Sequence, residues 1–126
     1  MNINPTTQSR HDVFAFERLD AYRLAVEFLA VAEVLTRRLP RTKGQLGDQL
    51  ARASEGIVLR IAEGAGAELK SADQKRYFRS ARGSALECAA VLDICRVRGI
   101  GSTGQLEQGR KLLVRIVQML TRLSRP

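Results

Sequence analysis

The stretch IAEGAGAEL, residues 61–69, holds two closely spaced glycines of the kind that can cradle a phosphate. A phosphate-binding loop needs a strand before its glycines and a helix N-terminus directly after them, often with a Lys followed by Ser or Thr. Here a helical pattern precedes Gly64 and Gly66, so the pair falls at the end of a helix, where left-handed glycine caps are common. The stretch therefore predicts a helix end and excludes a nucleotide-binding loop.

Cys88 and Cys95 could in principle form a disulfide or hold a metal. They are seven residues apart within one predicted helix. The helical rise separates them by roughly 10 Å, while a disulfide needs Cα atoms closer than about 7 Å. Two thiols without a third or fourth ligand do not make a zinc site either. We therefore predict two buried free thiols.

The charged residues Arg60, Glu63 and Glu87 raise the question of catalysis or metal binding. A di-iron bundle needs Glu-x-x-His pairs, but the single histidine of the chain is His11, near the N-terminus. Ser84 has no histidine to activate it, and close helix packing is its simpler explanation. Carboxylates near an Arg more often form ion pairs or caps. The sequence thus predicts no enzyme, no cofactor and no metal site.

Positive charge is the remaining chemical feature. The net charge is +8, and residues 71–126 hold seven of these eight charges. Basic residues recur at helical spacing in two segments, as Lys75, Arg79 and Arg82 and as Lys111, Arg115, Arg122 and Arg125. Such stripes could bind phosphates, or they could simply be solvated helix faces. No aromatic residue interleaves with them, so nucleic acid would be contacted through its backbone, with little sequence readout.

Four segments with the 3.6-residue period of an amphipathic helix must position these groups. They cover about residues 16–39, 44–63, 71–99 and 102–123. Since the connections are short and no segment alternates like a strand, we expect an all-α, antiparallel, up-down-up-down four-helix bundle. Residues 1–15 are polar and without period, so we expect a flexible N-terminal arm followed by one domain, residues 16–126.

Local signals mark the ends of these helices. Pro40 should stop the first, and Gly99 the third. Gly56, inside the second, costs helix stability and therefore indicates a close approach of another helix. Two pairs match the capping box, in which side chain and backbone bond reciprocally: Ser71 with Gln74, and Ser102 with Gln105.

The first predicted helix carries two apolar stripes, more than one neighbour can cover. The stripes are Leu24, Phe28, Val31 and Leu35, and Leu19, Tyr22, Val26, Leu29 and Ala32. Exposed apolar area of this size usually marks an interface, so the two stripes fit an oligomer. No apolar run approaches the roughly 20 residues that span a bilayer. The N-terminus also lacks the apolar centre of a secretory signal, so we expect a cytoplasmic protein.

Short segments spread along the four helices form a recognisable pattern. They are Phe16-Glu17-Arg18-Leu19, Gln49-Leu50-Ala51-Arg52-Ala53, Ile61-Ala62-Glu63-Gly64, Tyr77-Phe78, and Ala81-Arg82-Gly83-Ser84-Ala85-Leu86-Glu87. In this order and spacing, the chain from Phe16 to about Leu123 resembles the bacterial four helix bundle protein family, also called 23S rRNA-intervening-sequence proteins. It departs from that family at Arg60, where the family usually has an Asn.

The resemblance implies a bundle that assembles into a ring-shaped homo-oligomer, a pentamer in known relatives, with no established enzymatic activity. Relatives in diversity-generating retroelements, the accessory variability proteins, bind nucleic acid and a reverse transcriptase through a basic outer surface. We therefore expect a non-enzymatic homo-oligomer that binds nucleic acid, RNA in preference to DNA, through its basic helix surface. The alternative is an oligomeric scaffold for a protein such as a reverse transcriptase, in which the charge serves steering or solubility.

Overall fold

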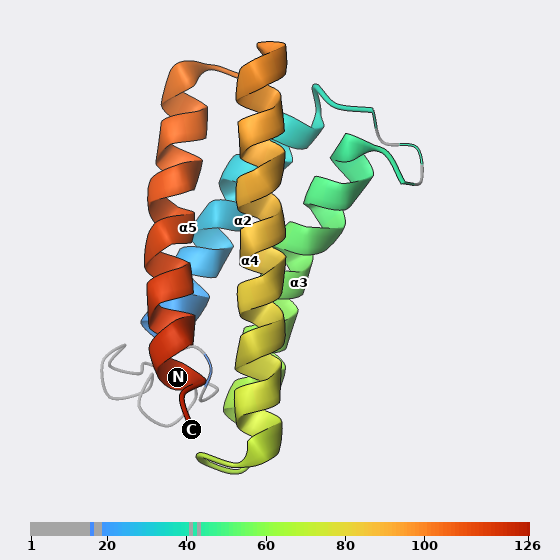
Figure 1. Ribbon diagram of the computed structural model, residues 1–126. Helices are drawn as coiled ribbons and strands as arrows, with labels where there is room; N and C mark the ends of the chain where they lie inside the picture. The colour runs from blue at the N-terminus through green and yellow to red at the C-terminus, as the bar shows by residue number, and fades with distance from the viewer. Residues whose placement is uncertain (1–15, 17–18, 41, 43) are drawn as a thin grey trace, which may run out of the picture.

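The computed structural model describes residues 16, 19–40, 42 and 44–126, and this part of the chain forms four α-helices without a strand. The helices are α2 (Asp20–Thr36), α3 (Leu46–Gly66), α4 (Ala72–Arg98) and α5 (Thr103–Leu123). Consecutive helices run in opposite directions in Figure 1. Each packs against its neighbours in the order α2, α3, α4, α5 and back to α2. The predicted all-α four-helix bundle is confirmed, while the predicted arm, residues 1–15, lies outside the described residues.

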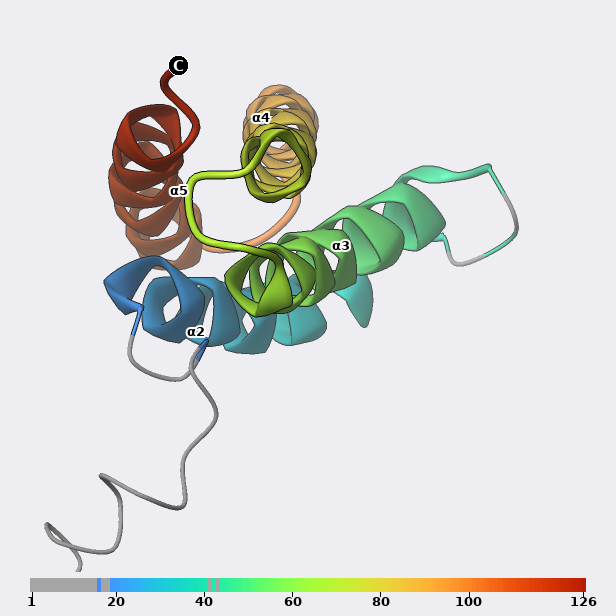
Figure 2. The same ribbon diagram turned by 90° about the horizontal axis from the view of Figure 1, so that it is seen from below.

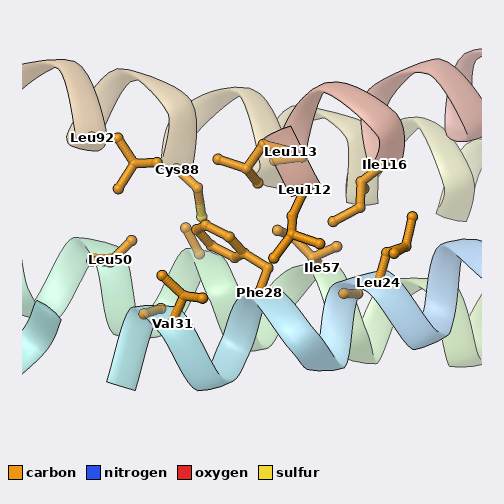
Figure 3. Close-up of a cluster of buried hydrophobic side chains, with 14 of the residues drawn as sticks. Leu24, Phe28, Val31, Leu50, Ile57, Cys88, Leu92, Leu112, Leu113 and Ile116 are labelled. Atoms are coloured by element: carbon orange, nitrogen blue, oxygen red, sulfur yellow. The ribbon is translucent and has the colours of Figure 1, made fainter. Parts of the chain in front are cut away.

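All four helices contribute aliphatic side chains to one core, with Phe28 of α2 in its midst (Figure 3). The residues labelled there around Phe28 are Leu24, Val31, Leu50, Ile57, Cys88, Leu92, Leu112, Leu113 and Ile116. Of the two apolar stripes predicted on the first helix, the one that contains Phe28 is buried throughout. Because interiors are packed as densely as organic crystals, this core determines how closely the helix axes can approach.

The first helix is shorter than predicted at both ends. It begins at Asp20, with Leu19 extended at the N-cap, and it ends at Thr36, before the predicted end at residue 39. Pro40 cannot continue a helix and disfavours helical geometry at the residue before it, so the chain leaves the helix ahead of it. Leu39 is nevertheless buried, so the turn that follows α2 closes this end of the core.

The end of α3 differs from the predicted glycine cap. The helix continues through Gly64 to Gly66 and ends at Ala67, whose φ of −80° is extended and not left-handed. Gly64 serves close packing instead, since a Cβ there would lie 2.8 Å from Cε1 of Phe78 and 3.0 Å from Cβ of Tyr77. The predicted helix end is therefore confirmed, and only the left-handed glycine cap was wrong. Spacing in sequence could not show that Gly64 is needed for packing against an aromatic ring of the next helix.

Glycine also permits close approach in the middle of α3. A Cβ at Gly56 would lie 3.1 Å from the Oγ of Ser84 on α4. This confirms the packing predicted for both residues. With Gly64, it brings α3 and α4 together at two points along their length.

The turn between α3 and α4 is held by Gln74. Ser71 accepts a hydrogen bond from the backbone N–H of Gln74 at 3.0 Å, as the predicted capping box requires. The reciprocal bond is absent, because the side-chain oxygen of Gln74 accepts from the backbone N–H of Lys70 at 2.8 Å. Its amide nitrogen donates to the carbonyl of Gly64 at 3.0 Å. Gln74 therefore connects the end of α3 to the start of α4.

The connection between α4 and α5 follows the prediction more closely. Gly99 caps α4 in the left-handed conformation, with a φ of 71°. Ser102 and Gln105 form both bonds of the capping box, at 3.1 and 3.2 Å. Both signals depend on neighbouring residues alone, which is why the sequence was sufficient for them.

We expect Gly64→Ala to lower the free energy of unfolding by about 1–3 kcal/mol, because the added methyl group overpacks the Phe78 ring. The matched control is Gly66→Ala in the same helix, where a Cβ meets nothing within 4 Å. That change should stabilise the protein by about 0.4–1 kcal/mol by restricting the unfolded chain. Urea unfolding of both variants measures the difference. Equal effects would contradict the packing role of Gly64.

Candidate nucleic-acid interface

Charge is divided between the two halves of the bundle. Helices α2 and α3 together contain six acidic and three basic residues, while α4 and α5 contain four acidic and ten basic residues. The first pair of helices therefore carries a net charge of −3 and the second pair +6. Figure 2 shows α4 and α5 side by side, opposite α2 and α3. An anionic partner would be drawn to the α4–α5 side.

Ion pairs neutralise several cations, but not those of α5. Between described residues, five pairs form, each within a single helix: Asp20–Arg23, Asp48–Arg52, Arg60–Glu63, Asp73–Arg76 and Asp93–Arg96. Exposed pairs of this kind add little stability, but they reduce the field around each arginine. Since α5 contains one acidic residue, Glu107, and none of these pairs, its positive charge is unopposed on its own helix.

The outer side of α5 presents three exposed cations in a row. Lys111, Arg115 and Arg122, here called the α5 stripe, lie on the opposite side of the helix from the buried Ile116 and Leu120. The stripe extends over about 16 Å along the helix axis. Arg125 is exposed too, but α5 ends at Leu123, so Arg125 lies beyond the regular helix on which its spacing placed it.

The cations predicted on the preceding helix take part in packing. The Nε of Arg82 donates to the hydroxyl of Thr121 at 2.9 Å, and that hydroxyl donates to the carbonyl of Val117 at 2.7 Å. Arg79 donates to the carbonyl of Ser124 at 3.4 Å. Both guanidinium groups thus reach the C-terminal end of α5, where a positive charge complements the helix dipole. Lys75 is half-buried, one turn earlier on α4.

Arg79 and Arg82 therefore reach α5 on the side that faces α4, whereas the α5 stripe lies on another side of that helix. Adjacent residues on a helix point about 100° apart, so Thr121 faces α4 while Arg122 turns away from it. Arg122 lines a shallow groove with Leu19, Asp20 and Ala21 at the start of α2. The sequence could not show this division, because periodicity does not reveal which neighbour each helix face meets. Arg110, which lines the α4–α5 groove, was missed because it falls off the stripe.

The other groups considered for chemistry have structural surroundings. Cys88 and Cys95 are free and buried, as predicted. Arg60, at the position where the family usually has an Asn, donates to the carboxylate of Glu63 at 2.6 Å, as the ion-pair interpretation expected. Among the described residues, no group of three or more His, Cys, Asp or Glu side chains could hold a metal ion. None of the four described helices is long and apolar enough to cross a membrane.

Comparison with known protein families places the chain in one of them. The family model described as 23S rRNA-intervening sequence protein matches residues 17–122. This range includes all four helices except the last residue of α5. No curated protein matches the chain.

Both thiols should be unreactive in the folded protein. Burial, with a smaller contribution from Glu87, raises the pKa of the Cys88 thiol from 9.0 to about 12, and burial also raises the pKa of Cys95. We expect no reaction with a disulfide reagent at neutral pH until denaturant is added, and then two thiols per chain. Prompt reaction of the native protein would contradict this assignment.

The raised pKa of Cys88 also predicts a dependence of stability on pH. Above pH 9.0 the unfolded thiol ionises while the folded one, with its pKa of about 12, does not. The contribution of the Cys88 thiol to the free energy of unfolding is therefore fully present below about pH 9, and it declines as the pH rises above that value. Urea unfolding at pH 8 to 10 should show a steeper decline for the wild type than for Cys88→Ala.

Proposed function

Because the chain belongs to the 23S rRNA-intervening sequence protein family, we propose that it is a non-enzymatic, homo-oligomeric bundle that binds nucleic acid through its basic surface. The name of the family refers to an RNA sequence, and this association favours RNA over DNA. We propose a cytoplasmic location as well, which the free thiols of Cys88 and Cys95 support. A ring of about five subunits, as in known relatives, is the proposed assembly.

The α5 stripe is the observation that carries the nucleic-acid proposal. Its three cations are exposed, and no ion pair with a described residue neutralises them. A solvated face that serves only solubility would normally mix both signs of charge. Lys75, Arg79 and Arg82 add positive potential at the α4 edge, although hydrogen bonds hold the two arginines to the end of α5.

Contacts to phosphates fit this surface better than contacts to bases. The helix α5 contains no aromatic residue, so it offers no platform on which an unpaired base could stack. Along its axis, Lys111 and Arg115 are separated by about 6 Å and Arg115 and Arg122 by about 10 Å. Three cations in a line on a rigid helix can follow a phosphate backbone, which positions a protein without reading sequence. We therefore propose binding to duplex RNA with little sequence preference.

The alternative function is a scaffold for a protein partner, such as a reverse transcriptase. Exposed apolar side chains on α4, with Val97 at 86% exposure, favour a protein contact somewhere on this molecule. In that case the positive charge would steer association without binding nucleic acid directly. Salt dependence separates the two proposals, because release of counterions accompanies phosphate binding.

Replacement of the α5 stripe by K111Q, R115Q and R122Q together should weaken binding to a short RNA duplex of arbitrary sequence by at least about tenfold. The slope of the logarithm of affinity against that of salt concentration should become shallower by about 2–3, one for each lost phosphate contact. Fluorescence anisotropy over a series of salt concentrations measures both quantities.

The matched control is R37Q, R38Q and R52Q, which removes the same charge from exposed arginines at the end of α2 and on α3. We expect it to change affinity far less than the first set. Equal losses from both sets would mean that net charge alone governs binding. No measurable affinity of the wild type at physiological salt would favour the protein scaffold instead.

A further inference from the structure

The outer side of α4 carries an apolar row that the rest of the described chain covers only in part. Leu86, Ala90, Ile94 and Val97, here called the α4 face, follow one another at helical spacing of three or four residues. Leu86 is 47% exposed, Ile94 38% and Val97 86%. The α4 face points away from the core, which α4 meets through Ala81, Ala85, Cys88, Leu92 and Cys95. Periodicity in the sequence predicted the inner face of this helix and its cations, but not this outer row.

A second apolar surface lies on α2. The second apolar stripe predicted on the first helix is only partly covered by the rest of the bundle. Val26 is 43% exposed, and Tyr22 and Leu29 are half-buried. These three residues are here called the α2 face. The backbones of α2 and α4 are not neighbours, and the two helices occupy diagonal corners of the bundle (Figure 2). The two faces therefore point in different directions, and one partner helix cannot cover both.

The helices that carry the two faces differ in net charge. The α4 face lies on the α4–α5 pair, whose residues sum to +6. The α2 face lies on the α2–α3 pair, whose residues sum to −3, or −1 with the exposed Arg37 and Arg38 at the end of α2. Two copies joined α4 to α4 would bring the two positive halves together, and two copies joined α2 to α2 would bring the negative halves together. A contact between α4 of one copy and α2 of another joins opposite charges and covers both apolar faces.

We propose that the α4 face of one copy docks on the α2 face of the next, head to tail. This inference rests on the homo-oligomer of the proposed function and specifies which surfaces form it. A contact between two different surfaces leaves one free surface at each end of a pair, so further copies can add. The assembly ends in a ring when the rotation from copy to copy closes, as the proposed ring of about five subunits requires. The α5 stripe is not part of either face and remains open to nucleic acid in such an assembly.

Two charge substitutions test the pairing. V97D places an acid on the α4 face, opposite the negative half of the next copy, and V26K places a base on the α2 face, opposite the positive half. Each buries a charge against an apolar surface and opposes a like charge, so each alone should reduce the multi-subunit mass of the wild type to that of a single subunit. Size-exclusion chromatography with light scattering measures these masses, and circular dichroism verifies the fold.

Mixing the two variants is the decisive step. V97D retains an intact α2 face and V26K an intact α4 face, so an equimolar mixture should form a complex of two or more subunits that neither forms alone. A mixture that remains at the mass of single subunits overturns the head-to-tail pairing. The pairing is also overturned if V26K alone still assembles like the wild type, since the α2 face would then not be used.

The control is L69D, which introduces the same charge at an apolar residue that is 78% exposed in the connection between α3 and α4, outside both faces. It should assemble like the wild type. A wild type that is itself monomeric would overturn the oligomer of the proposed function. If the wild type assembles and V97D has the same mass as the wild type, only the pairing of the α4 face with the α2 face is overturned. RNA binding by monomeric V97D tests the α5 stripe separately, because that variant retains all three of its cations.

Discussion

Close approach of helices at glycine positions is the constraint on which the rest of this bundle depends. Gly64 leaves room for the Phe78 ring, and Gly109 of α5 leaves room for Leu92 and Phe28, since a Cβ there would lie 3.0 Å and 3.3 Å from their carbons. Large side chains on one helix thus fill the space that glycine leaves on the next. With few aromatic residues in the chain, this fit allows a single central Phe28 and many aliphatic side chains to complete the core.

The rotation of each helix follows from this packing. Once the inner side of α4 packs against α3 and α5, the α4 face, which includes Val97, must point outward. The same argument applies to α5, where burial of Ile116 and Leu120 turns Lys111 and Arg115 to the surface. The exposed surfaces of the molecule are therefore consequences of its core, and their positions could not be chosen independently of it.

In the proposed assembly, nucleic acid and a second copy of the chain would use different surfaces of one small domain. Positive potential over α4 and α5 acts over a distance of about a Debye length, so it attracts an anion or an acidic protein surface alike. What distinguishes the two at close range is the apolar content of the surface. The α4 face can bury side chains against protein, whereas the α5 stripe offers only charges for phosphates. Hydrogen bonds from Arg79 and Arg82 to the end of α5 join α4 to α5, and so fix the position of the α4 face relative to the α5 stripe.

The sequence by itself determined the four helices, the caps at Gly99 and Ser102, the two buried thiols and the excess of positive charge, because each depends on periodicity, neighbouring residues or composition. The match to the family agrees with the resemblance in its motifs. Only the tertiary structure decided that Gly64 packs against Phe78, that Gln74 bridges two helices, and that Arg79 and Arg82 of α4 reach α5 on a different side from the α5 stripe. Periodicity assigns a residue to a side of its own helix, but which neighbour meets that side depends on how the side chains of all four helices fit together.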